Sequence, residues 1–161
     1  MTVTDDRATP VDVHVRVQRF YAAQMRLLDA GEAERWAGTF TEDGEFGQDN
    51  GSPPRRGRAT IAAGMRAAVD RRVAAGVVTR HWMGMVAVHP LPDGSVRTGC
   101  YALVVRAERG GPPAVGLSTT CADVLVPDGD SWLVRSRWVS HDGTPGKGFP
   151  MKLSSGEGDG P

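Results

Sequence analysis

The chain has 161 residues, 40% of them hydrophobic, which is enough for one domain with a single core. Its 19 basic residues balance 19 acidic ones, so the net charge gives no reason to expect binding to nucleic acid or to an anionic membrane. No apolar run is long enough to span a membrane, and the N-terminal segment lacks the apolar core of a signal peptide. We therefore expect a cytoplasmic protein in which Cys100 and Cys121 are free and buried.

Three helices are predicted in the first half of the chain. The first begins at Thr9 and Pro10, a capping hydroxyl followed by proline at the first helical position, and it ends at Gly31. Its apolar stripe contains Gln24, an amide that should either bond to a buried group or face a cavity. A second short helix, a short strand and a third helix are expected at 32–40, 42–50 and 60–76.

After Gly76 the hydrophobic period becomes strand-like, and three turn signals rich in Pro, Asp and Gly divide the remaining chain. Strands are expected near 78–90, 95–108, 114–126 and 131–141. Helices followed by an antiparallel meander predict an α+β fold, with three N-terminal helices packed on one face of a curved sheet. The domain should cover 10–153, between a flexible N-terminus at 1–9 and a disordered tail at 154–161.

Two-residue turns would also fix the strand register. They set His81 opposite Arg106 and Cys100 opposite Cys121, with Met85 on the same face as His81. Both faces of the predicted sheet are substantially apolar, whereas the helices can cover one of them. We therefore expect a homodimer formed through the outer face of the sheet.

Asp123 lies on the same predicted face as His81, where it is a candidate to orient the imidazole. A turn near Gly129 would instead set Asp123 almost opposite Arg137 on the neighbouring strand. Because such a pair is usually structural, we expect Asp123 to bind Arg137.

No metal or nucleotide motif is present in the sequence. The 4 histidines include no pair at the spacing of a helical metal site, and the glycine-rich stretch 143–148 matches no phosphate-binding fingerprint. We therefore expect no metal ion and no cofactor, so that any chemistry is carried out by side chains.

His81 opens a strand directly after a helix, with Met83 and Met85 as its expected neighbours on one face. An imidazole beside soft, adaptable thioethers is typical of a pocket wall where a proton is transferred next to an apolar ligand. The alternative is a core histidine whose ring nitrogens are satisfied by neighbouring groups.

The order of elements resembles the NTF2-like superfamily, specifically its SnoaL-like branch, over about residues 10–142. The local marks of this resemblance are 20–24 (FYAAQ), 36–44 (WAGTFTEDG), 79–82 (TRHW) and 132–139 (WLVRSRWV). Within that branch the chain is similar to small tailoring proteins of actinomycete aromatic-polyketide clusters, of the actinorhodin type. The resemblance implies an open cone enclosing an apolar pocket, often dimerised through the outer face of the sheet.

The family includes cofactor-free cyclases, dehydratases and isomerases, and also non-catalytic binding or stabilising subunits. In members similar to scytalone dehydratase, a histidine at the start of this strand acts in acid–base catalysis, and His81 matches that position. Those members also carry an aspartate in the short helix, where this chain has Gly38. They use a second histidine on the next strand, where this chain offers Cys100 or Tyr101.

Tyr21 and Gln24, one turn apart on the first helix, are expected to reach the same cavity as His81. A phenol can orient a carbonyl or donate a proton, and an amide can bond a quinone or enol oxygen. The alternative for Tyr21 is a core position with its hydroxyl at the rim. Besides these three catalytic candidates, the residues expected to contact substrate are Met83, Met85, Trp36, Tyr101, Cys100 and Thr119.

These features predict a cofactor-independent tailoring enzyme acting on an aromatic polyketide-type intermediate by ring closure or dehydration. His81 would remove a proton next to a carbonyl or from a hydroxyl, and Tyr21 or Gln24 would hold the developing enolate oxygen. The alternative hypothesis is a non-catalytic ligand carrier or partner-stabilising subunit, which Gly38 and the missing second strand histidine favour.

Overall fold

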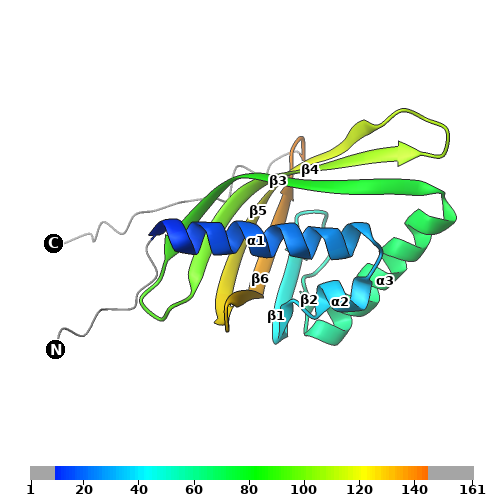
Figure 1. The fold of residues 1–161 in the computed structure, drawn as a ribbon. Helices are drawn as coiled ribbons and strands as arrows, with labels where there is room; N and C mark the ends of the chain where they lie inside the picture. The colour runs from blue at the N-terminus through cyan, green and yellow to red at the C-terminus, as the bar shows by residue number, and fades with distance from the viewer. Residues whose placement is uncertain (1–9, 145–161) are drawn as a thin grey trace, which may run out of the picture.

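The computed structural model describes residues 10–144, in which three helices precede the long strands of one sheet (Figure 1). The expected flexible N-terminus and tail lie outside the described residues. The elements are α1 (Pro10–Asp29), α2 (Ala33–Ala37), β1 (Phe40–Gln48), β2 (Arg55–Arg56), α3 (Arg58–Ala74), β3 (Val77–Pro90), β4 (Val96–Glu108), β5 (Ala114–Asp128) and β6 (Ser131–His141).

The strands form a mixed six-stranded sheet in the order β2-β1-β6-β5-β4-β3. Neighbouring strands are antiparallel except β1 and β6, which run parallel. The sheet curves around α1, while α2 and α3 lie beyond the C-terminal end of that helix (Figure 1). The expected α+β fold is therefore confirmed, with the meander extended by two strands from the first half of the chain.

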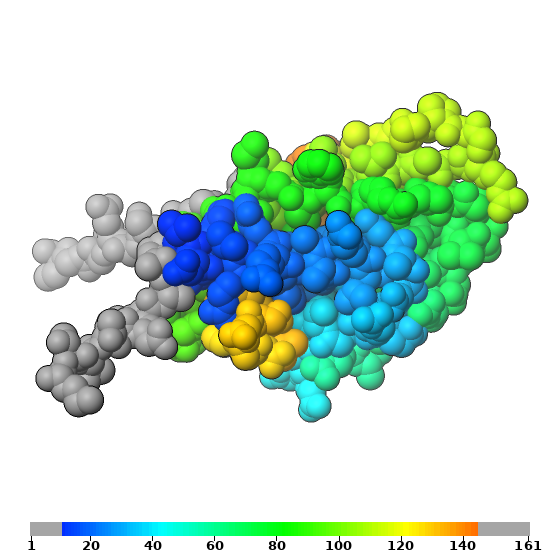
Figure 2. Space-filling view, in the orientation of Figure 1, coloured from blue at the N-terminus to red at the C-terminus, as the bar shows by residue number. Residues whose placement is uncertain are grey.

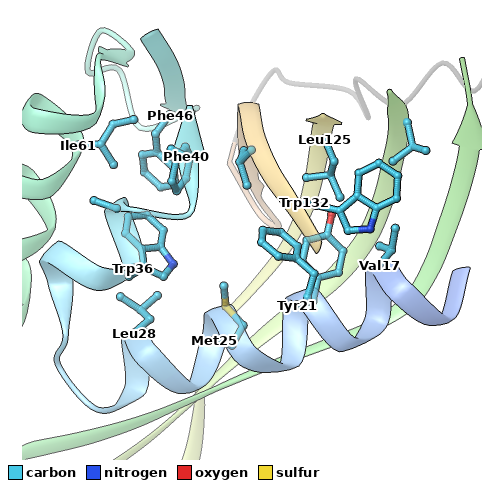
Figure 3. Close-up of a cluster of buried hydrophobic side chains, with 14 of the residues drawn as sticks. Val17, Tyr21, Met25, Leu28, Trp36, Phe40, Phe46, Ile61, Leu125 and Trp132 are labelled. Carbon is cyan, nitrogen blue, oxygen red and sulfur yellow. The ribbon is translucent and has the colours of Figure 1, made fainter. Parts of the chain in front are cut away.

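The core lies between α1 and the inner face of the sheet (Figure 3). Apolar residues of α1 such as Val17 meet Leu125 on β5 and Trp132 on β6, all of them nearly or fully buried. A second group of rings joins α2 to β1, because the Trp36 ring contacts Phe40 edge-on at a centroid distance of 4.9 Å. These contacts fix α1 across the sheet and so position the residues at its C-terminal end.

The pairing of β4 with β5 follows the expected register. Cys100 lies opposite Cys121, and this register extends along β4 to Val104. Both cysteines are free and buried, as expected.

The pairing of β3 with β4 differs from the expectation. His81 lies opposite Val104, not Arg106. The connection over residues 91–95 sets Pro90 opposite Val96, one residue from the expected register, and the register shift between Gly84 and Ala87 adds the second residue. A shift of two residues leaves side chains on the same face, since the side-chain period of a strand is two. His81 and Met83 therefore share one face with Val104 and Ala102, as the sequence predicted, and this is the inner face of the sheet.

A bulge in β3 moves Met85 away from that face. The register shifts between Gly84 and Ala87, and Met85 has a left-handed backbone with φ of 52°. An extra residue reverses the faces along the rest of the strand, so Val86 packs on the inner cluster while Met85 is 81% exposed. The expectation that Met85 shares the face of His81 is therefore wrong.

Candidate functional site

The imidazole of His81 is held by the carboxylate of Asp29, the last residue of α1. The distance between His81 Nδ1 and Asp29 Oδ1 is 2.6 Å. The backbone N–H of His81 also donates to both carboxylate oxygens, at 3.2 Å each. Gly31, with a left-handed φ of 79°, ends the helix just beyond Asp29 and turns the chain away from β3. The end of α1 and the start of β3 thus meet in one polar contact.

This contact determines what the ring can do. A carboxylate accepts a hydrogen bond from Nδ1–H, which favours the neutral tautomer whose lone pair is on Nε2. When Nε2 takes up a proton, the same carboxylate stabilises the resulting imidazolium. The side chains of His81 and Asp29 are 21% and 13% exposed, so the pair is partly shielded from water without being sealed off. This arrangement suits a general base.

His81 lines a groove of about 1090 Å³ between α1 and β3. Figure 2 looks onto this side of the molecule, where α1 (blue) lies beside β3 (green). The groove is open along one side, which differs from the enclosed pocket that the resemblance implied. Its lining combines apolar side chains with several charged ones: Val15, Gln18, Arg19, Tyr21, Ala22, Met25, Arg26, Asp29, Ala30, Arg80, His81, Trp82, Met83, Gly84 and Val86.

Tyr21 also borders the groove, but its hydroxyl is bound inside the core. It donates to Asp123 Oδ2 at 2.7 Å and lies 2.5 Å from Thr98 Oγ1. Burial, followed by the nearby Asp123 carboxylate, raises the pKa of Tyr21 well above 10.0. Because the single phenolic proton is donated to Asp123, this geometry does not favour Tyr21 as the group that holds an enolate oxygen. The catalytic role predicted for Tyr21 stays a prediction.

Asp123 is bound to Arg137, as expected. The Arg137 guanidinium makes two hydrogen bonds to the carboxylate, Nε to Oδ1 at 2.9 Å and Nη2 to Oδ2 at 2.6 Å. Both side chains are almost fully buried. Asp123 therefore does not orient the imidazole of His81, which instead contacts Asp29, a residue that the sequence analysis did not consider.

The raised pKa of Tyr21 predicts a loss of stability in alkali. Above about pH 10 the phenol ionises in the unfolded chain but stays protonated in the folded one, so stability falls as pH rises towards the folded pKa. Urea unfolding between pH 9 and 11 should show a slope steeper by up to about 1.4 kcal/mol per pH unit in the wild type than in Tyr21→Phe. Equal slopes in the two proteins would contradict this result.

Gln24 and Trp36 lie in the core where α1 meets α2. Gln24 Nε2 donates to Thr39 Oγ1 at 2.6 Å, and that hydroxyl donates to the backbone carbonyl of Trp36 at 2.6 Å. Gln24 thus takes the first of its two expected roles, a bond to a buried group. Gln24 Oε1 and Trp36 Nε1 are buried, and neither has a hydrogen-bond partner among residues 10–144. Neither residue lines the groove, so their predicted substrate contacts stay predictions.

The remaining residues expected to contact substrate are divided between the two faces of the sheet. Cys100 and Thr119 are buried on the inner face, where Met83 packs against the small cluster that contains Cys100. Met85 and Tyr101 are instead exposed, and Tyr101 pairs across the strands with Gly84 on the outer face. The structure therefore brings His81, Met83 and Tyr21 to one groove and leaves Met85 and Tyr101 outside it.

Asp29 is the residue of the candidate site that the sequence interpretation missed. One signal was present, because an acidic residue in the last turn of a helix faces the negative end of the helix dipole and is unfavourable there. Such a residue needs a compensating partner, and His81 supplies it. Within residues 10–144, no group of three or more His, Cys, Asp or Glu side chains is placed to hold a metal ion.

No described helix is both long and apolar enough to cross a bilayer. A search of the curated proteins found no match. Among solved structures, the chain is similar to ActVI-ORFA from Streptomyces coelicolor, with 36% identity, a TM-score of 0.77, and coverage of 84% of this chain and 98% of that one. A protein from Catenulispora acidiphila in complex with S-DNPA is also 36% identical, with a TM-score of 0.72 over 82% of this chain and 95% of that one.

An NTF2-like protein from Novosphingobium aromaticivorans, 22% identical, has a TM-score of 0.69 over 88% of this chain and 95% of its own, which shows the shared fold. The sequence family described as a SnoaL-like domain matches residues 11–138. Its match covers nearly all of α1, most of the sheet and both residues of the His81–Asp29 contact. The chain therefore belongs to the SnoaL-like domain family and has the NTF2-like α+β fold.

Proposed function

We propose that the chain is a cofactor-independent tailoring enzyme, a cyclase or dehydratase, acting on an aromatic polyketide-type intermediate. The observation that carries this proposal is the His81–Asp29 pair at the wall of a groove large enough for such a ligand. A 36% identical structure holds the small molecule S-DNPA, which supports binding of a ligand of that kind here.

The reaction begins at Nε2 of His81, which removes a proton from a carbon next to a carbonyl. The electron pair moves to the carbonyl oxygen and forms an enolate, while Asp29 stabilises the imidazolium. In a dehydration, the enolate expels a hydroxyl that leaves as water with the proton from the imidazolium. In a ring closure, the enolate carbon attacks a second carbonyl, and the imidazolium returns its proton to the new alkoxide.

The groove supplies charge as well as apolar contacts. Arg19, Arg26 and Arg80 are exposed cations on its lining, whereas Met83 forms part of its apolar wall. A guanidinium favours carboxylate or phenolate groups and can stabilise negative charge that develops on oxygen. Because the Tyr21 hydroxyl is bound to Asp123, these arginines are the better candidates to contact the enolate.

Exchange of hydrogen for deuterium tests the proposed proton abstraction without knowledge of the natural substrate. S-DNPA is incubated with the protein in D2O, and its mass and proton spectrum are followed. An enzyme of this kind should speed deuterium incorporation next to a carbonyl, or convert the compound into an isomer or a product lighter by one water. A compound that binds but shows neither change would contradict the proposal.

A non-catalytic ligand carrier or partner-stabilising subunit is the second candidate. The engaged hydroxyl of Tyr21 and the absence of histidine at Cys100 and Tyr101 favour it. The His81–Asp29 contact favours the enzyme, since a carrier has no need of an oriented base. Tight binding without deuterium incorporation would identify the carrier.

We also propose that two chains pair through the outer face of β3 and β4. Trp82 is 73% exposed and lies directly opposite Leu103, with the exposed ring of Tyr101 on the same face. An exposed patch of this kind marks a protein interface. Light scattering should therefore report twice the 17.2 kDa mass of one chain. Trp82→Glu should give the monomer, whereas a wild-type monomer at micromolar concentration would contradict the interface.

A further inference from the structure

The groove at His81 extends around the edge of the sheet. β3 is the edge strand on this side, because it stands last in the strand order. Side chains alternate between the two faces of a strand, so Trp82 and Gly84 lie on the outer face, opposite to that of His81. These three residues and Met83 all line the groove. A ligand in this groove is therefore within reach of both faces of β3.

Trp82 borders the groove although most of its surface is in solvent. A Cβ added at Gly84 would lie 3.8 Å from Trp82 Nε1 and 3.9 Å from its Cδ1, so the indole leans along β3 over this glycine. Exposed side chains change rotamer on the picosecond-to-nanosecond timescale. In a single chain, Trp82 is thus a part of the groove wall that is not held in one position.

Trp82 also belongs to an apolar patch on the outer face of three neighbouring strands. This outer patch consists of Val78, Trp82, Tyr101, Leu103 and Val115. At roughly 150–250 Å² for a complete side chain of these sizes, their exposed fractions amount to about 500–600 Å². One partner of a standard interface contributes about 800 Å², of which somewhat over half is apolar. The outer patch therefore supplies the apolar area that one partner of a stable dimer needs.

A second copy of this chain is the partner that fits the outer patch. A two-fold pair brings the same surface of both chains together, so that apolar side chains meet apolar side chains. Net charge does not oppose this pairing, because 19 basic residues balance 19 acidic ones. Since Trp82 lies opposite Leu103 within the patch and also borders the groove, the partner and the ligand meet at one residue.

We propose that pairing of two chains and ligand binding in the groove are coupled through Trp82. In the pair, the partner's patch covers the indole and holds it in one position, which fixes a part of the wall that the ligand meets. The coupling is reciprocal: the dimer binds ligand more tightly than the monomer, and ligand-bound chains pair more tightly than free ones. The coupling rests on the proposed function and the proposed dimer, and it adds the regulation of that site.

Substitution of Leu103 removes the pairing without touching the groove, because this exposed residue of the outer patch does not line it. Leu103→Glu and Leu103→Lys should both be monomers, since pairing would bury two like charges. Titration calorimetry should show that both bind S-DNPA at least about fivefold more weakly than the dimeric wild type. Val73→Glu is the control, since Val73 is exposed on α3 outside the patch and the groove, and it should leave pairing and binding unchanged.

The wild type tests the same coupling without any substitution. Sedimentation velocity over a range of protein concentrations gives the dissociation constant of the dimer, with and without saturating S-DNPA. The ligand should lower that constant by at least about fivefold, because linkage requires the effect to act in both directions. A dimer whose dissociation constant does not respond to bound S-DNPA overturns the proposal, and so does a wild type that stays monomeric or does not bind S-DNPA.

The two Leu103 variants also separate pairing from charge. A loss of affinity common to Glu and Lys reports the missing partner, whereas opposite effects of the two would show a direct electrostatic influence on the ligand and overturn the coupling. Monomeric variants that bind S-DNPA as tightly as the wild type overturn it too.

The outcome is separable from that of the proposed function. If S-DNPA gains deuterium while pairing and binding are independent, the enzyme stands and the coupling is wrong. If pairing and binding are coupled while S-DNPA gains no deuterium, the chain is a ligand carrier whose affinity depends on its dimer, and the coupling stands.

Discussion

Replacing Asp123 by Val should lower the free energy of unfolding by about 3–5 kcal/mol, because Arg137 would then be a buried cation without its partner. The Arg137 side chain is 3% exposed and that of Asp123 is fully buried. Burial alone lowers the pKa of Arg137, but the adjacent Asp123 carboxylate more than offsets this and holds that pKa above its usual value. Arg137 thus depends on one counter-charge.

The double variant Asp123→Val with Arg137→Met should recover most of this loss. A buried ion pair replaced as a whole by apolar side chains is often close to neutral, since neither charge is left in the core. The remaining deficit should be about 1 kcal/mol, from the hydrogen bond that Tyr21 donates to Asp123. Urea unfolding of the two single variants and the double variant measures the coupling. Additive losses would show that the pair is not coupled.

This pair explains why the sequence predicted one part of the site correctly. Cys100 lies opposite Cys121 and Asp123 opposite Arg137, as expected, although a one-residue register shift lies between each turn and the pair. A short turn restricts pairing to within a residue or two, so alternation and turn chemistry are enough to bring a charged pair together within the meander. The structural role of Asp123 was therefore predictable.

The position of Met85 was not predictable in this way. The register shift between Gly84 and Ala87 inserts an extra residue, and Met85 has a left-handed backbone there. Gly84 was a local signal, because an isolated glycine in a strand often marks a bulge, but the alternating pattern was followed through it. An alternating pattern read through a bulge assigns every later residue to the wrong face. Val86 and Met85 accordingly exchanged the faces expected for them.

Contacts between segments that are distant in the sequence could also not be predicted from the hydrophobic pattern and the turns. The parallel pairing of β1 with β6 joins segments at opposite ends of the domain, and no turn connects them. The approach of Asp29 to His81 depends likewise on how α1 crosses the sheet, which is set by packing in the core. Such long-range contacts determine which residues meet in the candidate site, whereas local patterns determine the order of the helices and strands.

Replacing His81 by Asn should slow the enzyme by about 10²–10⁴-fold, the contribution expected of one positioned general base. The substitution retains an N–H donor near the position of Nδ1, so the contact to Asp29 can persist while Nε2 is lost. Binding of S-DNPA should change little, since the loss falls on proton removal and not on ligand contact. Initial rates of deuterium incorporation, with binding measured separately, check this expectation.

Asp29→Asn tests whether the carboxylate acts through His81. It should slow exchange by about 100-fold, because the amide neither enforces the productive tautomer nor stabilises the imidazolium. The double variant should be no slower than His81→Asn alone, since groups that act as one unit are not additive. His89→Asn, a matched change at an exposed histidine, should leave the rate unaltered. If the rate losses of the two single variants multiply in the double variant, Asp29 affects the reaction by a route independent of His81. An unchanged exchange rate in His81→Asn would exclude this imidazole as the base.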